Sequence, residues 1–306
     1  MTTVLPHGAA VGQAPTRRPR RWKRLLRDNS VKGWIFMVPL ILVNVVVILI
    51  PGISAVYYSL TDWSGIGDAT FIGFANYVEM FSNEAFANAL WHNIIWTIFF
   101  LIVPMTMGLF GAYALSRLRR FALFFRVAFF IPYIIATVVI ASIWRVLLSP
   151  DVGLGKILGI NFLGESEWAL GAVAFINNWA WWGFLVVVFL ASMQGINPSL
   201  YEAASLDGAS PARQFISITL PAIRPTFMFL GLMTIIWSFL SFDYVYILTQ
   251  GGPAGSTEVL STLLYREAFT NLNAGYASAI GVIMAAITGV VVAAYLWIRK
   301  TRDWEI

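Results

Sequence analysis

Residues 33–60 read GWIFMVPLILVNVVVILIPGISAVYYSL and contain no charged side chain. A helix needs about 20 mostly apolar residues to cross the hydrocarbon core of a bilayer. Only helices and closed barrels can span that core, because they pair their own backbone N–H and C=O groups. The stretch therefore predicts a transmembrane helix over residues 33–58.

The composition of the whole chain agrees with this prediction. Hydrophobic residues make up 59% of the 306 residues and charged residues only 11%, whereas soluble globular domains carry about 25% charged residues. Besides 33–58, five more runs have the length and apolar character of a span: 93–115, 124–146, 169–192, 223–248 and 275–298. We expect an all-α polytopic membrane protein with six transmembrane helices.

Lysine and arginine set the expected orientation of these spans. Of the 20 basic residues, 17 lie in the N-terminal tail, the turn after the second span, the loop after the fourth span and the C-terminal end. Only Arg145, Lys156 and Arg266 belong to the opposite side. Cytoplasmic loops carry the excess of positive charge, so both termini and residues 193–222 are predicted to be cytoplasmic.

The N-terminal region allows other interpretations. A cleaved secretory signal in residues 17–55 is disfavoured, because the apolar run is longer than that of a signal and the alternation of basic loops requires this span. Residues 20–27, where Trp22, Leu25 and Leu26 stand among basic residues, fit either a helix on the membrane surface or a disordered basic tail.

A polar insert between the fourth and fifth spans carries helix signals. Asn197-Pro198 is typical of a helix start, Gly208 of a helix end, and Ser210-Pro211 of a second start. We expect two short helices joined by a glycine turn, the second ending near Leu220-Pro221. An ordinary helical connector would show the same signals. A DNA-binding helix-turn-helix is excluded, because Arg213 is the only basic residue before Arg224 and phosphate binding needs several.

The spacing inside this insert resembles a known family. Glu202-Ala203-Ala204, then Gly208 and Ile218-Thr219-Leu220-Pro221, is similar to the cytoplasmic loop in permease subunits of binding-protein-dependent ABC importers. Four further stretches resemble the MalF-like sugar permeases among them: Phe71–Tyr77, Thr249–Pro253 with Thr257, Tyr265–Phe269 and Gly275–Ala279. The very large outer domain and extra spans of some MalF proteins have no counterpart here.

The resemblance implies a fold, a division of the chain and a set of partners. The fold is that of a type-1 ABC importer transmembrane domain. The expected parts are the basic tail 1–32, the first span with its outer loop 33–88, the transmembrane core 89–298 with the coupling loop 193–222, and the tail 299–306. The implied partners are a MalG-like sister permease, two ATPase subunits, an extracytoplasmic solute-binding protein and membrane lipid, without nucleic acid, in a bacterial cell membrane.

The resemblance also assigns roles to residues. ATPase coupling falls on Glu202, Ala203, Ala204, Asp207, Gly208, Ile218, Leu220 and Pro221. The sequence has no phosphate-binding Gly-x4-Gly-Lys-Ser/Thr loop, the nearest stretch being Gly153–Lys156. We therefore expect no ATPase site and no cofactor on this chain, with ATP and Mg bound by the partner ATPase subunits.

Polar and aromatic residues inside the spans are candidates for a solute passage. The candidates are Asn177, Asn178, Trp181, Trp182, Asp243 and Tyr244. Amides at depth need partners, and aromatic faces beside hydrogen-bonding groups suit sugars. A tryptophan belt at the membrane interface fits equally well. We expect Asp243 to pair with Arg145, and the small residues Ala277, Gly281, Ala285, Gly289 and Ala293 to form a helix–helix seam.

The sequence therefore predicts a permease subunit that imports a sugar or a sugar-like solute. A glycerol-3-phosphate or glycerophosphodiester importer of the same architecture is the alternative. A self-sufficient secondary transporter should show ion-coupling carboxylates deep in its spans and internal repeats, and neither is evident. A membrane enzyme is disfavoured, because no cluster of His, Asp and Glu lies at one membrane face. With no cysteine and only His7 and His92, thiolate and multi-histidine metal sites are disfavoured too.

Overall fold

The computed structural model describes residues 29–118 and 120–301. These residues form helices and loops, with one isolated β-bridge between Thr61 and Phe71. The chain divides into two compact units, Met1–Ser54 and Ala55–Ile306. The predictions made for residues 1–28 of the basic tail and for residues 302–306 lie outside the described residues.

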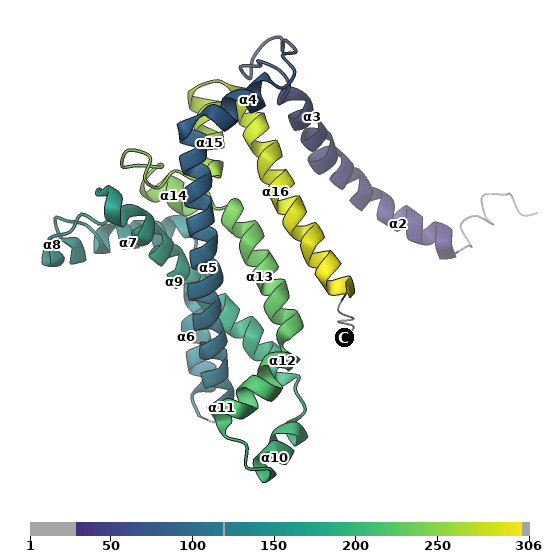
Figure 1. The fold of residues 1–306 in the computed structure, drawn as a ribbon, viewed down its shortest axis with the longest axis vertical. Coiled ribbons are helices and arrows are strands. Elements are labelled where there is room, and N and C mark those ends of the chain that lie inside the picture. Colours follow the sequence, from purple (N-terminus) through teal and green to yellow (C-terminus); the bar gives the residue numbers. More distant parts are fainter. Residues whose placement is uncertain (1–28, 119, 302–306) are drawn as a thin grey trace, which may run out of the picture. The chain divides into compact units, whose positions relative to one another are not determined.

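The described part of the first unit is helical from Asn29 on, and its last helix ends in the second unit. It consists of α2 (Asn29–Asn44), the π-helical turn η1 (Val45–Leu49) and α3 (Ile50–Tyr58) (Figure 1). The wide turn η1 comes just before Pro51, whose ring would clash with the carbonyl four residues earlier in a regular α-helix. Its apolar part, Phe36–Tyr58, matches the predicted first span.

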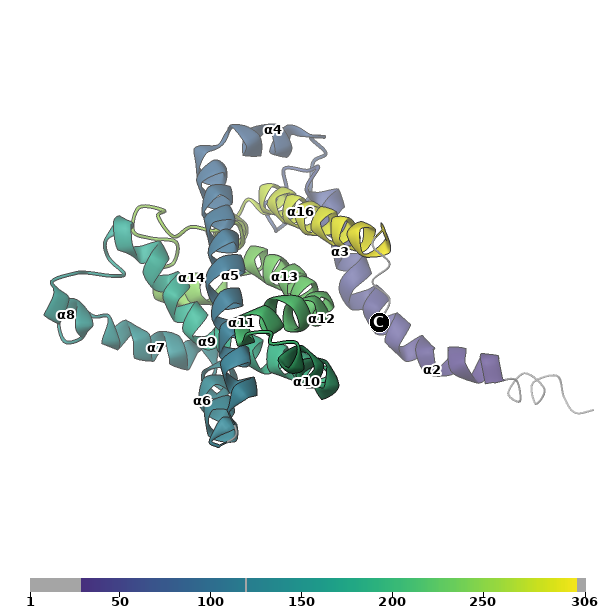
Figure 2. The same cartoon turned by 60° about the horizontal axis from the view of Figure 1, so that its bottom comes forward.

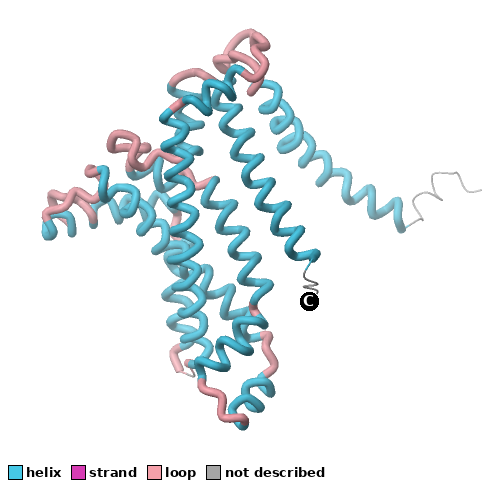
Figure 3. The backbone as a smooth tube through the Cα atoms, in the orientation of Figure 1, coloured by secondary structure: helices cyan, strands magenta, loops and turns pink. Residues whose placement is uncertain are grey.

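The second unit contains all the remaining described helices. In chain order they are α4 (Ala75–Ser82), α5 (Glu84–Arg117), α6 (Ala122–Ile134), α7 (Thr137–Leu147), α8 (Leu154–Leu158), α9 (Ser166–Gln194), α10 (Pro198–Leu206), α11 (Pro211–Gln214), η2 (Phe215–Thr219), α12 (Leu220–Ala222), α13 (Arg224–Phe239), α14 (Asp243–Leu248), α15 (Leu260–Tyr265), η3 (Arg266–Thr270) and α16 (Ala274–Thr301). Figure 3 shows the loops that connect these helices in pink.

The core of this unit lies along α5 and α9. These two helices pack along each other, α13 packs against α5, and α6 packs against α9 (Figures 1 and 2). Fully buried side chains such as Met105, Leu185 and Phe189 fill one part of the core, and Trp96 with Ile176 fills another. The long helices are thus fixed to each other by apolar side chains that face inward.

The predicted spans are found, with one correction. Five described segments are long and apolar enough to cross a membrane: Phe36–Tyr58, Glu84–Arg117, Ser166–Gln194, Arg224–Leu248 and Ala274–Thr301. The predicted third span, 124–146, is not one straight helix but the pair α6 and α7, which bend by 96°. Ile135 and Ala136 adopt extended ψ angles of 136° and 135° at this bend, which stops the helical hydrogen bonding.

The predicted small-residue seam on α16 is used over half of its length. Ala277 is buried, and a Cβ added to Gly281 would lie 3.3 Å from a methyl group of Leu264. α16 packs there against α15, η3, α4 and α13. Ala285, Gly289 and Ala293 lie further along the same helix and are exposed. The first half of the stripe is therefore a helix–helix contact within the chain.

Gly183 allows the closest helix contact in this core. A Cβ added at this position on α9 would lie 1.7 Å from the backbone carbonyl oxygen of Phe129 on α6. No side chain can fit there without moving the two helices apart. On the same helix, Gly171 has no atom within 4 Å of such a Cβ, so it offers a matched control.

Gly183→Ala should therefore lower the stability of the fold by about 1–3 kcal/mol, the usual cost of overpacking. The melting temperature of the purified protein in detergent measures this change. Gly171→Ala should leave the melting temperature unchanged or raise it slightly, because alanine favours a helix over glycine. Equal melting temperatures for the two variants would contradict the close contact between α6 and α9.

Candidate functional site

The 193–222 loop forms the two capped helices that the sequence predicts. The Asn197 side chain accepts a hydrogen bond from the Ser199 N–H (3.0 Å) and caps α10, with Pro198 at the first helical position. The Ser210 hydroxyl accepts from the Arg213 N–H (3.3 Å) and caps α11. Gly208 joins them with a φ of +74°, a conformation that other residues adopt only with strain.

The second helix of this loop ends near Leu220-Pro221, as predicted. It runs through α11, η2 and α12 to Ala222, and only Ile223 separates it from α13. The π-helical turn η2 comes directly before Pro221. As at Pro51, a wider turn lets the chain pass a proline ring that a regular helix would exclude.

Four hydrogen bonds that were not predicted hold the loop together and fix it to α5. The Gln214 amide, which is buried, donates to the Ser205 hydroxyl (3.0 Å) and to the Ala209 carbonyl (3.2 Å). The hydroxyls of Tyr201 and Thr219 lie 2.8 Å apart. The Tyr113 hydroxyl of α5 donates to the Pro211 carbonyl (3.1 Å). α10 and the helix that follows it therefore form one structural unit.

This unit presents an exposed surface. α10 has no buried residue, and its Leu206 side chain is 90% exposed. Most of the predicted coupling residues share this exposure, namely Glu202, Ala203, Asp207, Gly208, Leu220 and Pro221, while Ala204 and Ile218 are half-buried. Leu200, Ile216 and Leu220 of the same loop are exposed as well, so the loop presents several apolar side chains on its surface.

A large cavity lies on the inner side of α10. Its volume is about 950 Å³, and it is bounded by the ends of α5 and α9, the start of α6 and the loop itself. Glu202 lines it from α10, with Arg117 and Arg126 contributed by α5 and α6. The hydrogen bonds of Tyr201 and Ser205 hold α10 beside this space.

Four of the six predicted passage residues come together at a second cavity. Asn177 and Trp181 from α9 and Asp243 and Tyr244 from α14 line a space of about 230 Å³. Its other lining residues are Trp96, Phe100, Thr234, Trp237, Ser238, Leu240, Ser241 and Phe242. A second space of about 150 Å³ shares Asn177, Trp181 and Tyr244. We call the two together the aromatic cavity.

Asn178 and Trp182 do not line the aromatic cavity. The Asn178 amide is buried and lies 3.5 Å from the sulfur of Met107 on α5. The Trp182 ring packs on Phe129 of α6, with 4.7 Å between the ring centroids. Each follows a cavity residue by one position, and one position on a helix turns the side chain by about 100°. The structure therefore separates the two pairs onto different faces of α9.

The predicted ion pair between Asp243 and Arg145 is not formed. The Arg145 guanidinium donates instead to the backbone carbonyl of Ile247 in the last turn of α14. The last carbonyls of a helix lack partners inside the helix and attract cations. Asp243 lies at the opposite end of the same helix, in its first turn. The two side chains therefore occupy the two ends of α14 rather than meeting.

Several residues of the aromatic cavity were missed from the sequence. Thr234, Trp237, Ser238 and Ser241 all line it, and their spacing of i, i+3, i+4 and i+7 places them on one face of a helix. A polar and aromatic face inside an apolar run was the signal that could have found them. Trp96 and Phe100, four residues apart on α5, belong to the same wall.

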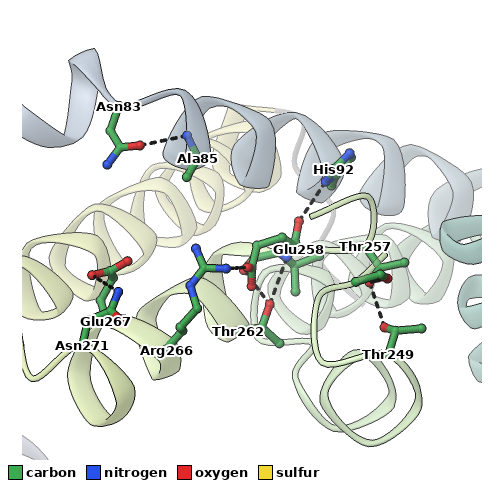
Figure 4. Close-up of polar contacts among 12 residues, drawn as sticks. Asn83, Ala85, His92, Thr249, Thr257, Glu258, Thr262, Arg266, Glu267 and Asn271 are labelled. Carbon is green, nitrogen blue, oxygen red and sulfur yellow. Dashed lines mark hydrogen bonds and ion pairs between the residues drawn. The ribbon is translucent and has the colours of Figure 1, made fainter. Parts of the chain in front are cut away.

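The loop after α14 is held by polar contacts near one end of α5 (Figure 4). Glu258 is only 4% exposed and forms an ion pair with Arg266. The His92 ring nitrogen Nδ1 lies 2.9 Å from the Glu258 carbonyl oxygen. The hydroxyls of Thr249 and Thr257 lie 2.7 Å apart. These contacts explain why the stretch 249–257 adopts one compact conformation.

Asn93 connects this loop to the wall of the aromatic cavity. Its side chain is fully buried, accepts a hydrogen bond from the Leu260 N–H (2.7 Å) and donates to the Ser238 carbonyl (3.0 Å). It therefore joins α5, α13 and α15 at one point. Ser238 itself lines the cavity, so this amide positions one of its walls.

The unit thus combines a capped, exposed helix pair at one end with a polar, aromatic cavity between its spans, and the match to a family of transport proteins assigns it to the ABC importer permeases. Residues 104–303 match the family described as the binding-protein-dependent transport system inner membrane component. The chain belongs to this family. It is a multi-pass permease subunit of the inner membrane with the type-1 ABC importer fold.

Curated relatives cover almost the whole chain. It is 36% identical to the probable ABC transporter permease protein YurN of Bacillus subtilis, over 86% of this chain and 94% of that protein. It is 35% identical to the diacetylchitobiose uptake system permease protein NgcF of Streptomyces coelicolor, over 92% of this chain and 85% of that protein. It is 32% identical to the sn-glycerol-3-phosphate transport system permease protein UgpA of Agrobacterium fabrum, over 85% of this chain and 91% of that protein.

A solved structure has the same fold. A bacterial ABC transporter that imports the acidic polysaccharide alginate matches with a TM-score of 0.80 and 25% identity, over 93% of this chain and 99% of that chain. The same transporter in complex with an alginate-bound periplasmic protein matches equally well, with a TM-score of 0.80.

Asn93→Ala should lower the free energy of unfolding by about 1–3 kcal/mol, because it leaves the buried Leu260 N–H without a partner and removes one of the hydrogen bonds to the Ser238 carbonyl. The melting temperature of the purified protein in detergent checks this. Asn271→Ala is the control, since it removes only an exposed hydrogen bond to Glu267 (3.0 Å). A melting temperature for Asn93→Ala equal to that of the control would show that Asn93 is not a structural link.

Proposed function

We propose that this chain is the MalF-like subunit of an ATP-driven importer for a sugar or sugar-like solute, which an extracytoplasmic binding protein delivers. The aromatic cavity is the observation that carries the choice of solute. Half of the residues around its larger part are aromatic, and hydroxyl and amide groups stand between them. The relative named for diacetylchitobiose uptake supports the same choice.

The chemistry of the cavity suits a sugar ring. A sugar presents C–H groups on its faces, which pack on aromatic rings, and hydroxyls on its edge, which need hydrogen-bond partners. The indole N–H of Trp181 is buried without a partner in the described chain. The Asn177 amide lines both parts of the cavity and makes no hydrogen bond with other described residues. The Asn177 amide is therefore available to a solute, and the Trp181 ring offers an aromatic face beside it.

The proposed partners follow from the exposed loop. We infer that α10 faces the cytoplasm and docks on an ATPase subunit, where Glu202 offers a charge to a basic residue. The sequence lacks a phosphate-binding loop, so ATP and Mg would bind to two partner ATPase subunits. A MalG-like sister permease and a solute-binding protein would complete the importer.

The geometry supports a route by which motion at α10 reaches the cavity. Hydrogen bonds fix α10 to the helix that follows it, and that helix continues into α13 with only Ile223 between them. α13 then lines the aromatic cavity through Thr234, Trp237 and Ser238. A displacement of α10 would therefore tilt α13 and move one wall of the cavity, which is the change that alternating access requires.

A glycerol-3-phosphate importer is the second candidate. Relatives named for sn-glycerol-3-phosphate transport are 30–32% identical to this chain. They share its architecture, so the fold alone does not separate the two solutes. The charge of the residues that line the aromatic cavity is the feature by which the protein could discriminate between a neutral sugar and glycerol-3-phosphate.

Glu202→Lys and Gly208→Asp should each abolish solute-stimulated ATPase activity of the reconstituted importer. The first reverses a charge on the docking surface, and the second places a side chain at a φ of +74° that strains the turn. Both variants should still insert into the membrane at normal levels. Gly195→Asp is the control, because it makes the same substitution in the same loop at an ordinary φ of −77°. Normal stimulation in both test variants would remove the coupling role.

Asn177→Ala should weaken uptake about fivefold, the effect of losing one hydrogen bond of about 1 kcal/mol to the solute. Trp181→Ala should weaken it further, because a ring face is lost as well. Uptake is measured at equal amounts of assembled importer. Asn178→Ala and Trp182→Ala are matched controls one position along α9, which should change the melting temperature more than uptake. Equal uptake defects in both pairs would contradict a solute role for the cavity.

A further inference from the structure

The aromatic cavity is built around a break in the fifth span. Leu240, Ser241 and Phe242 lie between α13 and α14 without helical structure, inside a segment apolar enough to cross the membrane. All three line the cavity. Non-helical backbone at membrane depth is tolerated only where protein buries it or where it borders a space open to water. Such interrupted helices mark solute sites in transporters.

The charge around this cavity has one sign. Asp243 is the only charged side chain among the described residues that line its two parts, and no lysine, arginine or histidine lines either of them. The nearest candidate for a neutralising partner, Arg145, donates to the Ile247 carbonyl at the other end of α14. The Asp243 side chain is exposed to the cavity rather than packed in the core.

The remaining polar groups around the cavity are uncharged. Asn177 offers N–H donors, while Ser241 offers a hydroxyl. These groups suit hydroxyls and acetamido groups, which donate and accept in turn. None of them balances the negative charge of a phosphate or a carboxylate brought close to Asp243.

We propose that Asp243 sets the charge class of the solute, so that the passage takes neutral or amine-bearing saccharides and disfavours phosphorylated and carboxylate-bearing ones. This inference rests on the proposed function. Two like charges about 6 Å apart at an effective dielectric constant near 20 repel enough to lower occupancy about 100-fold. The same field favours a solute that carries an ammonium group.

A passage that disfavours anions would give this chain a different solute from two of the proteins that it matches. One relative is named for sn-glycerol-3-phosphate and one structure for the acidic polysaccharide alginate, and both solutes are anions. A neutral disaccharide such as the one in the name of the diacetylchitobiose permease meets no repulsion from Asp243. The cavity therefore favours the carbohydrate function over the glycerol-3-phosphate alternative.

The sign of the field can be measured without knowing the solute. The chain has no cysteine, so Ser241→Cys places a single thiol of this chain in the cavity. The complete importer, with partner cysteines removed, is treated with a cationic and an anionic methanethiosulfonate of similar size. Relative to their rates with a free thiol, the cationic reagent should react at least about tenfold faster than the anionic one.

Adding Asp243→Asn to this background should bring the two rates to within about twofold of each other. Asp151→Asn, which removes an exposed carboxylate from the loop after α7, is the matched control and should leave the ratio unchanged. Equal rates in the parent variant, or a ratio that survives Asp243→Asn, would overturn the proposal. A thiol that reacts with neither reagent would overturn it as well, since the cavity would then be closed to solutes.

A solute panel tests the consequence. Quenching of tryptophan fluorescence in the importer, reconstituted in lipid nanodiscs, is compared for N-acetylglucosamine, glucosamine and N-acetylglucosamine 6-phosphate. The first two should bind at least about tenfold more tightly than the phosphate, and Asp243→Asn should narrow this gap. If N-acetylglucosamine 6-phosphate binds as tightly as N-acetylglucosamine, Asp243 does not select solutes by charge, and the proposed importer function still stands. Quenching by none of the three would contradict the proposed sugar passage itself.

Discussion

Backbone groups that lack a hydrogen-bond partner in lipid cost several kcal/mol each, and this constraint shapes the whole structure. Most of the chain meets it with regular helix. Where the helix stops, at residues 135–136 and 240–242, the protein must enclose the exposed backbone. Alternatively, the backbone can border a space open to water, and both breaks border the aromatic cavity: Ile135 lines its smaller part and residues 240–242 line its larger part. The interruption of the helix, which is costly for stability, thus also creates room for a solute.

The same constraint links the two functional regions. Because α13 cannot bend freely in lipid, it behaves as a stiff element between its ends. One end joins the 193–222 loop through Ile223, and the other carries Thr234 and Ser238 into the cavity wall. Asn93 fixes the Ser238 carbonyl to α5 and α15. If α10 docks on a partner as proposed, the resulting motion acts on a cavity wall that is held at its far end.

Periodicity and capping chemistry predicted most of the fold. Five of the six apolar runs, the caps at Asn197 and Ser210 and the turn at Gly208 are local signals, and they are confirmed; the third run is divided between α6 and α7. The 96° bend between α6 and α7 was missed, because it depends on tertiary packing: α6 packs on α9, whereas α7 packs mainly on α14. Asn177 and Asn178 are chemically identical neighbours, and only the packing of α9 against α5 decides which one faces the cavity.

The charge of the cavity follows from how α14 satisfies its own ends. Its last carbonyls need donors, and Arg145 supplies one at Ile247. That cation is therefore engaged at the C-terminal end of α14 and does not neutralise Asp243 in the first turn. The sequence suggested an ion pair because it shows opposite charges at similar depth and not the direction of the short helix between them. The unpaired carbonyls at the end of α14 hold Arg145 away from Asp243, and the Asp243 carboxylate is therefore left facing the aromatic cavity.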